Sequence, residues 1–201
     1  MFSGIVEAQV PLKRLKERAQ ILELRLERPR NFNDLKAGDS IAVNGVCLTV
    51  EDLTTDEIAF AVAAETLQVT GWSMEKLGKQ SFNLERSISL GDRIHGHLVA
   101  GHVDGIGRVV DKVTRGESTE LLIAFDEAMR PFLWRKGSVA VNGVSLTINE
   151  VEGGKFRICL IPETLRRTNL GALLAGDTVN LEADMMARGL VNWLRHEEAR
   201  R

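Results

Sequence analysis

The sequence has few residues of the kinds that form disulfides or bind metals. It contains only two cysteines, Cys47 and Cys159, in 201 residues. A pair without a visible export signal is more typical of free thiols than of a disulfide framework, so we expect two thiols. Three histidines, His95, His97 and His102, lie close together, yet no cysteine or further histidine completes a zinc pattern. We therefore expect no metal site.

Long apolar runs and an excess of either charge are missing as well. No run approaches the roughly 18 residues that cross a bilayer, and the first residues lack the charged region of a secretory signal. The formal net charge of −2 gives no electrostatic reason to bind nucleic acid or an anionic membrane. A hydrophobic content of 44% with 27% charged residues is ordinary for a soluble globular protein. We expect a cytoplasmic protein with neither nucleic-acid nor membrane partners.

What the sequence does contain is a long internal repeat. Residues 40–50 (SIAVNGVCLTV) recur at 138–148 as SVAVNGVSLTI, with eight of eleven positions identical. Residues 4–7, 65–67 and 83–85 also have matches 97 or 98 residues later. A collinear repeat on this scale indicates two copies of one domain.

The repeat predicts domains over residues 1–97 and 98–185, followed by a tail over 186–201. Domains of this size bury little core alone, so they must pack against each other or against another chain. The tail has apolar residues at helical spacing and no counterpart in the first copy. It either packs back on the domains or joins neighbouring chains, and we favour the second alternative.

Each copy of residues 40–50 is typical of a β-hairpin. Asn44-Gly45 and Asn142-Gly143 supply the positive-φ pair of a type I′ turn, between alternating apolar residues. Short helical turns are expected at 65, near 127–134 and over 163–173. Further strands are expected over 2–11, 20–27, 58–63 and 80–88, and over 101–112, 119–125, 155–161 and 178–183. Some six short strands per copy indicate a small closed antiparallel barrel, because closure removes exposed edges.

Longer motifs make the chain resemble riboflavin synthases of the alpha-chain type. They are MFSGIV at 1–6, the doubled VNGVxLT, GHLVAGHVDG at 96–105 and IPETLRRTNL at 161–170. The resemblance covers nearly the whole chain. It implies a mainly β fold of two tandem six-stranded antiparallel Greek-key barrels, of the flavin reductase-like, lumazine-binding type, plus a C-terminal α-helix. It also implies that this helix assembles a homotrimer, and it leaves open an association with a lumazine synthase capsid.

The resemblance further implies a reaction. Two molecules of 6,7-dimethyl-8-ribityllumazine dismutate without cofactor or metal, and one gives a four-carbon unit to the other. The products are riboflavin and 5-amino-6-(ribitylamino)uracil, in the final step of riboflavin biosynthesis. Donor and acceptor are one compound, so two similar sites are needed; in this family they come from the N-terminal barrel of one chain and the C-terminal barrel of a neighbour.

Two other functions would fit the same fold. One is a carrier that binds lumazine or flavin without turnover, and the other is a structural pair of barrels. The ligand residues kept in the second copy favour the enzyme, and a purely structural pair leaves the matching polar positions unexplained.

By resemblance, the substrate-binding residues form two groups. Backbone groups at strand ends and nearby hydroxyls suit the edge of a pteridine ring. The N-terminal site uses Gly4, Ile5, Val6, Cys47, Leu48, Thr49, Ala61, Val62, Ala63, Ala64, Glu65 and Thr66, with Phe2 covering it. The C-terminal site uses Gly101, His102, Val103, Lys136, Ser145, Leu146, Thr147, Ile161, Pro162, Glu163, Thr164, Leu165 and Arg166.

Two residues stand out as catalytic candidates because the copies differ there. His102 replaces Ile5, which points to proton transfer or hydrogen bonding to the substrate ring; a structural histidine is the alternative. Cys47 stands where the second copy has Ser145. Its thiol could activate water or add to the ring, or it could simply fill space as a small apolar residue.

Two further candidates have equally good structural explanations. Ser40 resembles a family residue beside the donor, yet Ser138 stands at the same place in the second copy and makes a shared scaffold role plausible. Asp184 stands where the family carries a functional acid, and it could equally cap the tail helix.

Overall fold

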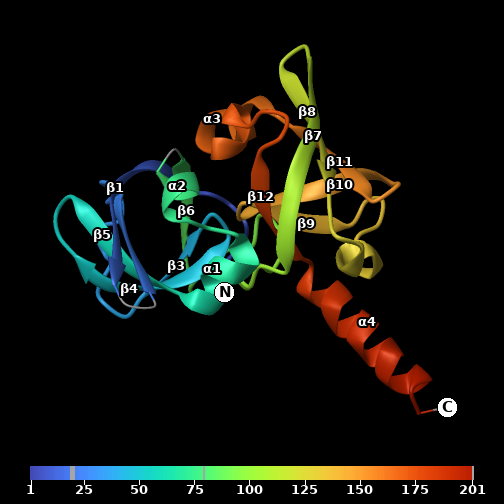
Figure 1. The fold of residues 1–201 in the computed structure, drawn as a ribbon, viewed down its shortest axis with the longest axis horizontal. Coiled ribbons are helices and arrows are strands. Elements are labelled where there is room, and N and C mark those ends of the chain that lie inside the picture. Colours follow the sequence, from blue (N-terminus) through green and yellow to red (C-terminus); the bar gives the residue numbers. More distant parts are fainter. Residues whose placement is uncertain (19–20, 79, 201) are drawn as a thin grey trace.

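The computed structural model describes residues 1–18, 21–78 and 80–200. Two barrels, one from each half of the chain, lie side by side with the N terminus between them, and a helix extends away from both (Figure 1). The predicted mainly β fold with a C-terminal helix is thereby confirmed. Within the described residues, no helix combines the length and the apolar character needed to cross a membrane.

The first barrel closes six antiparallel strands in the order β1-β2-β5-β4-β3-β6. Two short helices, α1 (Ala64–Thr70) and α2 (Met74–Leu77), connect β5 to β6. The apolar faces of the strands meet inside, where Phe60 and Leu24 are fully buried. The strands are β1 (Ala8–Arg18), β2 (Ile21–Glu27), β3 (Ser40–Val43), β4 (Val46–Leu53), β5 (Glu57–Ala63) and β6 (Ser81–Arg86).

The second barrel repeats this topology, with the strand order β7-β8-β11-β10-β9-β12 around a closed circle. A 3-10 helix η1 (Glu127–Phe132) precedes its hairpin, and α3 (Pro162–Arg167) and η2 (Asn169–Ala172) follow β11. The strands are β7 (Gly105–Arg115), β8 (Ser118–Ala124), β9 (Ser138–Val141), β10 (Val144–Glu152), β11 (Lys155–Leu160) and β12 (Thr178–Ala183).

The segments before β1 and β7 differ from the prediction. Strands were expected from residues 2 and 101, and this is wrong, because the strands begin at Ala8 and Gly105. Residues 1–7 and 98–104, which we name the crossing segments, instead pair with each other through a bridge between Phe2 and Val99. The end of each segment still bonds its own barrel, because the amides of Glu7 and Asp104 donate to the carbonyls of Leu84 (2.9 Å) and Leu181 (2.8 Å).

Each crossing segment packs on the opposite barrel. Val6 belongs to the apolar core of the second barrel, and Val103 packs against the core of the first. Burying a valine side chain is worth about 1.5–3 kcal/mol. The exchange therefore ties together two domains that are each small for a core.

The two hairpin turns meet back to back at the centre of the molecule. Asn44, Gly45, Asn142 and Gly143 all have positive φ, which confirms the predicted type I′ turns. A Cβ atom on Gly45 would lie 2.7 Å from the backbone nitrogen of Gly143, and the reverse also holds. Glycine is therefore needed here both for its φ angle and for the close approach of the other turn.

Buried asparagines hold this contact. The side-chain amide of Asn83 donates to the carbonyl of Asn142 (3.0 Å), and that of Asn180 donates to the carbonyl of Asn44 (2.8 Å). Asn169 breaks the symmetry, because Gly71 stands at its place in the first copy. The Asn169 amide donates to Asn44 Oδ1 and to the Ser81 carbonyl (both 2.9 Å), so this residue of the second half is anchored in the first barrel.

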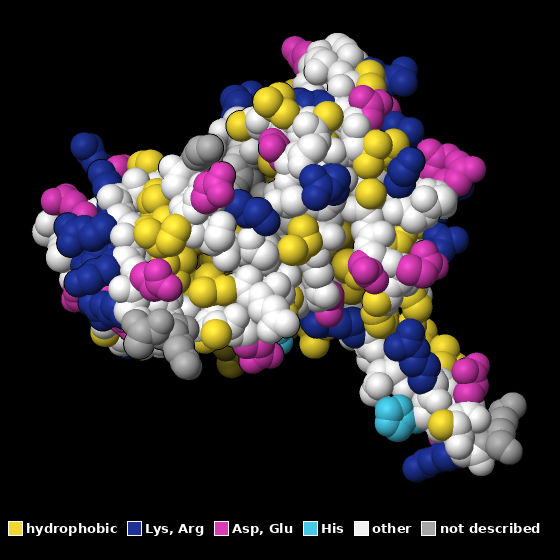
Figure 2. Space-filling model, viewed as in Figure 1, with side chains coloured by type: hydrophobic (Ala, Val, Ile, Leu, Met, Phe, Trp, Pro, Cys, Tyr) yellow, Lys and Arg dark blue, Asp and Glu magenta, His cyan; other side chains and the backbone are white. Residues whose placement is uncertain are grey.

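The tail forms the helix α4 (Met185–Glu198), with its first turn capped by Asp184. The predicted helix is confirmed, although it begins at Met185, and residue 201 lies outside the described residues. Its apolar side chains face solvent in the single chain: Met186 is 73% exposed and Trp193 59%. Figure 2 shows hydrophobic side chains along this projecting helix.

Replacing Asn169 by alanine should weaken the contact between the barrels. The change leaves Asn44 Oδ1 and the side-chain amide of Asn83 without one partner each in a buried environment. We expect the free energy of unfolding in urea to fall by about 2–4 kcal/mol. The matched control is Asn33→Ala, an exposed asparagine in a loop. Equal losses in both variants would contradict the role of the asparagine contact.

Candidate functional site

The crossing segments lie along the strands that carry the thiol and the hydroxyl of the repeat. The carbonyl of Gly101 accepts a hydrogen bond from the amide of Cys47 (2.8 Å), and the carbonyl of Gly4 accepts one from the amide of Ser145 (2.8 Å). Both glycines have positive φ. A Cβ atom on Gly101 would lie 2.6 Å from Cβ of Cys47, so only glycine permits this approach.

This arrangement corrects the predicted grouping of the site residues. Gly4, Ile5 and Val6 were assigned to the N-terminal site, but they lie against the second barrel, beside Ser145. Gly101, His102 and Val103 were assigned to the C-terminal site, and they lie against the first barrel, beside Cys47. The two copies of the repeat match each other equally well whether each segment packs on its own barrel or on the opposite one. The sequence therefore could not distinguish the two arrangements.

The structure thus groups residues 101–103 with the predicted residues 47–49 and 61–66, and we name this group the first-barrel candidate site. Within it, Leu48 and Val62 are buried in the core and shape the site from inside. Cys47 is half-buried against a small cluster that contains Phe2 and Val99. The exposed members, which a ligand can reach, are Thr49, Ala63, Ala64, Glu65 and His102.

The second-barrel candidate site is the corresponding group of predicted residues, 4–6, 136, 145–147 and 161–166. Its exposed side chains include Ile5 (41%) and Ile161 (58%), which offer apolar surface to a planar ring. Lys136 has φ +69°, while Gly38 stands at its place in the first copy. A lysine held in a left-handed conformation is strained, and such strain is concentrated at functional positions.

Glu163 at the start of α3 is paired with the two arginines that end the helix, Arg166 and Arg167. The hydrogen bond from Arg166 lowers the pKa of Glu163, so this carboxyl is an anion at neutral pH. Both Glu163 and Arg166 are exposed, and they place a charged pair at the rim of the second-barrel site.

His97 lies beside the second-barrel candidate site, although the sequence analysis gave it no catalytic role. Its Nδ1 atom lies 2.7 Å from the hydroxyl of Ser145, while its buried Nε2 has no partner among the described residues. Burial lowers the pKa of His97, and the nearby charge of Asp184 acts in the opposite direction. The signal in the sequence was the GHLVAGH motif itself, which places His97 five residues before His102.

The remaining predicted residues have clear structural positions. Phe2 is part of the first crossing segment and is fully buried in a small cluster with Ala42, Val99 and Ala140, so it does not close over a site. Ser40 begins β3 opposite Thr49. Asp184 accepts a hydrogen bond from the amide of Met186 (2.8 Å), as the capping alternative predicted.

Two buried glutamates hold the crossing segments from their own barrels. Glu85 accepts hydrogen bonds from the amides of Ser3 (2.7 Å) and Gly4 (3.0 Å). Glu182 accepts them from the amides of Ala100 (2.7 Å) and Gly101 (2.9 Å). Burial raises the pKa of both carboxyls, that of Glu182 to about 7.

Two cavities lie among the described residues, and only the second is lined by a crossing segment. One, of about 450 Å³, lies between the barrels and is lined by residues that include Lys76, Arg108 and Asn169; it contains none of the predicted substrate-binding residues. The other, of about 510 Å³, includes Ile5 and Glu85 and borders the second-barrel site. We place the candidate sites at the crossing segments, because the repeated polar residues converge there.

The lumazine binding domain model matches this chain twice, over residues 3–87 and 100–184. The fold and the doubled site thus define a protein with two lumazine-binding domains. Solved structures of LumP have the same fold: the complex with riboflavin gives a TM-score of 0.84 at 23% identity, over 91% of this chain and 99% of that one. At this identity the similarity establishes the fold alone.

Sequence relatives identify the family within that class. The riboflavin synthase of Brucella abortus (strain 2308) is 39% identical over 193 residues, which cover 94% of this chain and 95% of the relative. The riboflavin synthase of Bacillus subtilis (strain 168) is 37% identical over 199 residues, covering 96% and 90% respectively. The chain belongs to the riboflavin synthase family.

The raised pKa of Glu182 predicts a dependence of stability on pH. The folded protein takes up this proton near pH 7, whereas an unfolded glutamate does so near pH 4.5. Between these values the folded state binds more protons, so its stability rises as the pH falls through the window, by roughly 3 kcal/mol in total. Urea unfolding of the wild type between pH 8 and 5 should show this gain, and Glu182→Gln should lack it. Parallel curves for the two proteins would contradict the raised pKa.

Proposed function

We propose that this protein is a transferase that dismutates two molecules of 6,7-dimethyl-8-ribityllumazine. One molecule gives a four-carbon unit to the other, which becomes riboflavin, and the donor becomes 5-amino-6-(ribitylamino)uracil. The observation that carries the proposal is the pair of related but unequal sites. Two copies of one binding surface suit two copies of one substrate, and the differences between the surfaces suit the two roles.

The first-barrel site is assigned to the donor. Cys47 lies there beside Gly101, whose carbonyl accepts a hydrogen bond from the Cys47 amide, and His102 is the residue after Gly101. The thiol can add to the ring carbon C7 or activate water for this addition, and the imidazole can move protons to and from the substrate. The second-barrel site has Ser145 and Ile5 at the matching places. It binds the acceptor, with hydroxyl and backbone groups at the ring edge.

Orientation supplies much of the catalysis in this proposal. The lumazine is already reactive, because its 7-methyl protons are acidic and its C7 accepts nucleophiles. Holding two such rings face to face replaces a bimolecular encounter by a reaction within one complex. Modest acid-base assistance from His102 is then sufficient.

The facing sites come from neighbouring chains of a homotrimer built on α4. This helix exposes Leu190 and Trp193 over more than half of their surface, together with Met186. Such an apolar face is unfavourable in water and is buried when helices of several chains associate. A cytoplasmic location stays a prediction of the sequence, and the resemblance leaves an association with lumazine synthase open.

A lumazine carrier is the second candidate function, because the solved relatives of similar fold are LumP complexes with lumazine and flavins. The enzyme is favoured by the second barrel, which keeps Ser145, Lys136 and the exposed isoleucines around a formed site. A carrier needs one working site, whereas a dismutation needs two.

Turnover is tested by adding 6,7-dimethyl-8-ribityllumazine to the purified protein and following riboflavin by absorbance. The wild type should form riboflavin, and His102→Gln should lower kcat at least about tenfold, because a proton-transfer group typically contributes more than that. Cys47→Ser should also lower kcat, and its rank against His102→Gln separates the two roles. His196→Gln, an exposed histidine on α4, is the matched control. Tight lumazine binding without riboflavin would establish the carrier instead.

The trimer is tested on the exposed face of α4. Sedimentation velocity of the wild type should give a species of three times the 22.2 kDa chain. Trp193→Asp puts a charge into the proposed helix contact and should shift the protein to monomers with loss of turnover. Glu198→Asp at the end of the helix is the control. Trimers that persist in Trp193→Asp would place the contact elsewhere.

A further inference from the structure

Glu182, on strand β12 of the second barrel, is connected to the first-barrel site through Gly101. The side chain is 2% exposed, and its two oxygens accept the amides of Ala100 and Gly101. The carbonyl of Gly101 in turn accepts the amide of Cys47, and His102 is the next residue. Gly101 is thus bound to Glu182 through its amide and to Cys47 through its carbonyl, and His102 follows it in the chain. A change in the charge of Glu182 can therefore move both proposed catalytic residues through the backbone of Gly101.

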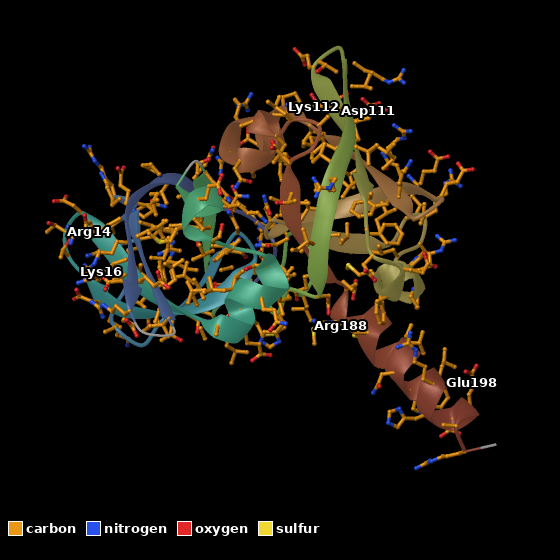
Figure 3. All side chains as sticks on the ribbon, viewed as in Figure 1. Arg14, Lys16, Asp111, Lys112, Arg188 and Glu198 are labelled. Atoms are coloured by element: carbon orange, nitrogen blue, oxygen red, sulfur yellow. The ribbon has the colours of Figure 1, made fainter. Side chains whose placement is uncertain are left out.

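Arg188 in the first turns of α4 holds this carboxylate from the other side. Its Nη2 atom lies 3.4 Å from Glu182 Oε1, and its Nη1 atom lies 3.1 Å from Asp104 Oδ1. Asp104 is itself fixed, because its Oδ2 atom accepts the amide of Ala183 (2.8 Å). Figure 3 shows Arg188 at the start of α4, close to the lower end of β7.

The first copy of the repeat holds its glutamate differently. Glu85 accepts a third hydrogen bond from the hydroxyl of Ser3 (2.8 Å), and none of the described cations forms an ion pair with it. Arg86 next to it pairs with Glu7 and Asp34 instead. The cation is thus specific to the copy whose crossing segment carries His102, and it comes from the helix that the first copy lacks.

We propose that Glu182 and Arg188 are positioning residues for the first-barrel site: Arg188 favours the carboxylate form of Glu182, and both carboxylate oxygens fix the segment that carries His102. A carboxylate accepts at both oxygens, whereas a protonated carboxyl presents a hydrogen to one of the two amide donors. Protonation would therefore release one amide and loosen residues 100–102. The kinetic part of this proposal rests on the proposed riboflavin synthase function, and the backbone part does not.

The charges around Glu182 support this assignment. Burial raises the pKa of Glu182 to about 7, the amides and Arg188 act in the opposite direction, and Asp104 adds to the rise. Without Arg188, the carboxyl would be protonated at a higher pH. Arg188 reaches Glu182 only because α4 begins directly after β12. The position of the helix therefore affects the charge of Glu182 and, through it, the first-barrel site.

The first test compares Arg188→Met with Arg188→Lys, and with Arg195→Met as a control on the same helix. In Arg188→Met we expect kcat near pH 7 to fall about tenfold or more, with a smaller change in KM. The acid limb of the pH profile should move to higher pH, and Arg188→Lys should recover part of both effects. Sedimentation velocity of each variant separates these effects from loss of the trimer.

The second test uses hydrogen exchange, measured by mass spectrometry on the peptide that spans residues 98–104. Exchange should be faster in Arg188→Met and unchanged in Arg195→Met. Glu182→Gln should show the fast exchange at every pH between 6 and 8, and adding Arg188→Met to it should have no further effect on exchange or kcat.

Unchanged exchange and an unmoved pH profile in Arg188→Met would overturn the proposal, even if that variant were less stable. Additive effects of Arg188→Met and Glu182→Gln would overturn it as well. A wild type that forms no riboflavin would contradict the proposed function. Hydrogen exchange of residues 98–104 would still decide whether Glu182 and Arg188 position the segment.

Discussion

The structure depends on the exchange of two short segments, one from each half of the chain, between the two barrels. Gly4 and Gly101 each have an amide bound to a glutamate of one barrel and a carbonyl bound to a strand of the other. This double attachment requires glycine, since a side chain would collide with Ser145 or Cys47. Both candidate sites are therefore composite, and neither barrel could form its site alone.

The molecule is nearly symmetric, and its proposed chemistry lies where the symmetry is broken. His102 against Ile5 and Cys47 against Ser145 give one site an imidazole and a thiol. Asn169 against Gly71 anchors the second half of the chain to the first. A repeat that had stayed identical could bind two substrates but could not give them different roles.

The two buried glutamates reduce the stability of the fold as carboxylates, yet they hold the crossing segments in place. A carboxylate removed from water is unfavourable, which is why burial raises the pKa of Glu85 and Glu182. The same burial makes each carboxylate a strong acceptor for the backbone of a crossing segment. Ser3 and Arg188 offset the cost in two different ways, and only the second links a site to α4.

The sequence by itself determined the repeat, the type I′ hairpins, the closed barrels and the tail helix, because these follow from local periodicity and turn chemistry. The offset of 97 or 98 residues also located the residues that differ between the copies. Only the tertiary structure decided which barrel receives each crossing segment, that His97 reaches Ser145, and that Arg188 faces Glu182. Extended segments have the same pattern wherever they pair, and a contact between residues 48 positions apart, such as His97 and Ser145, leaves no local periodicity to detect. Arg188 and Glu182 are only six positions apart, but one lies in a helix and the other in a strand, so no single periodicity relates them.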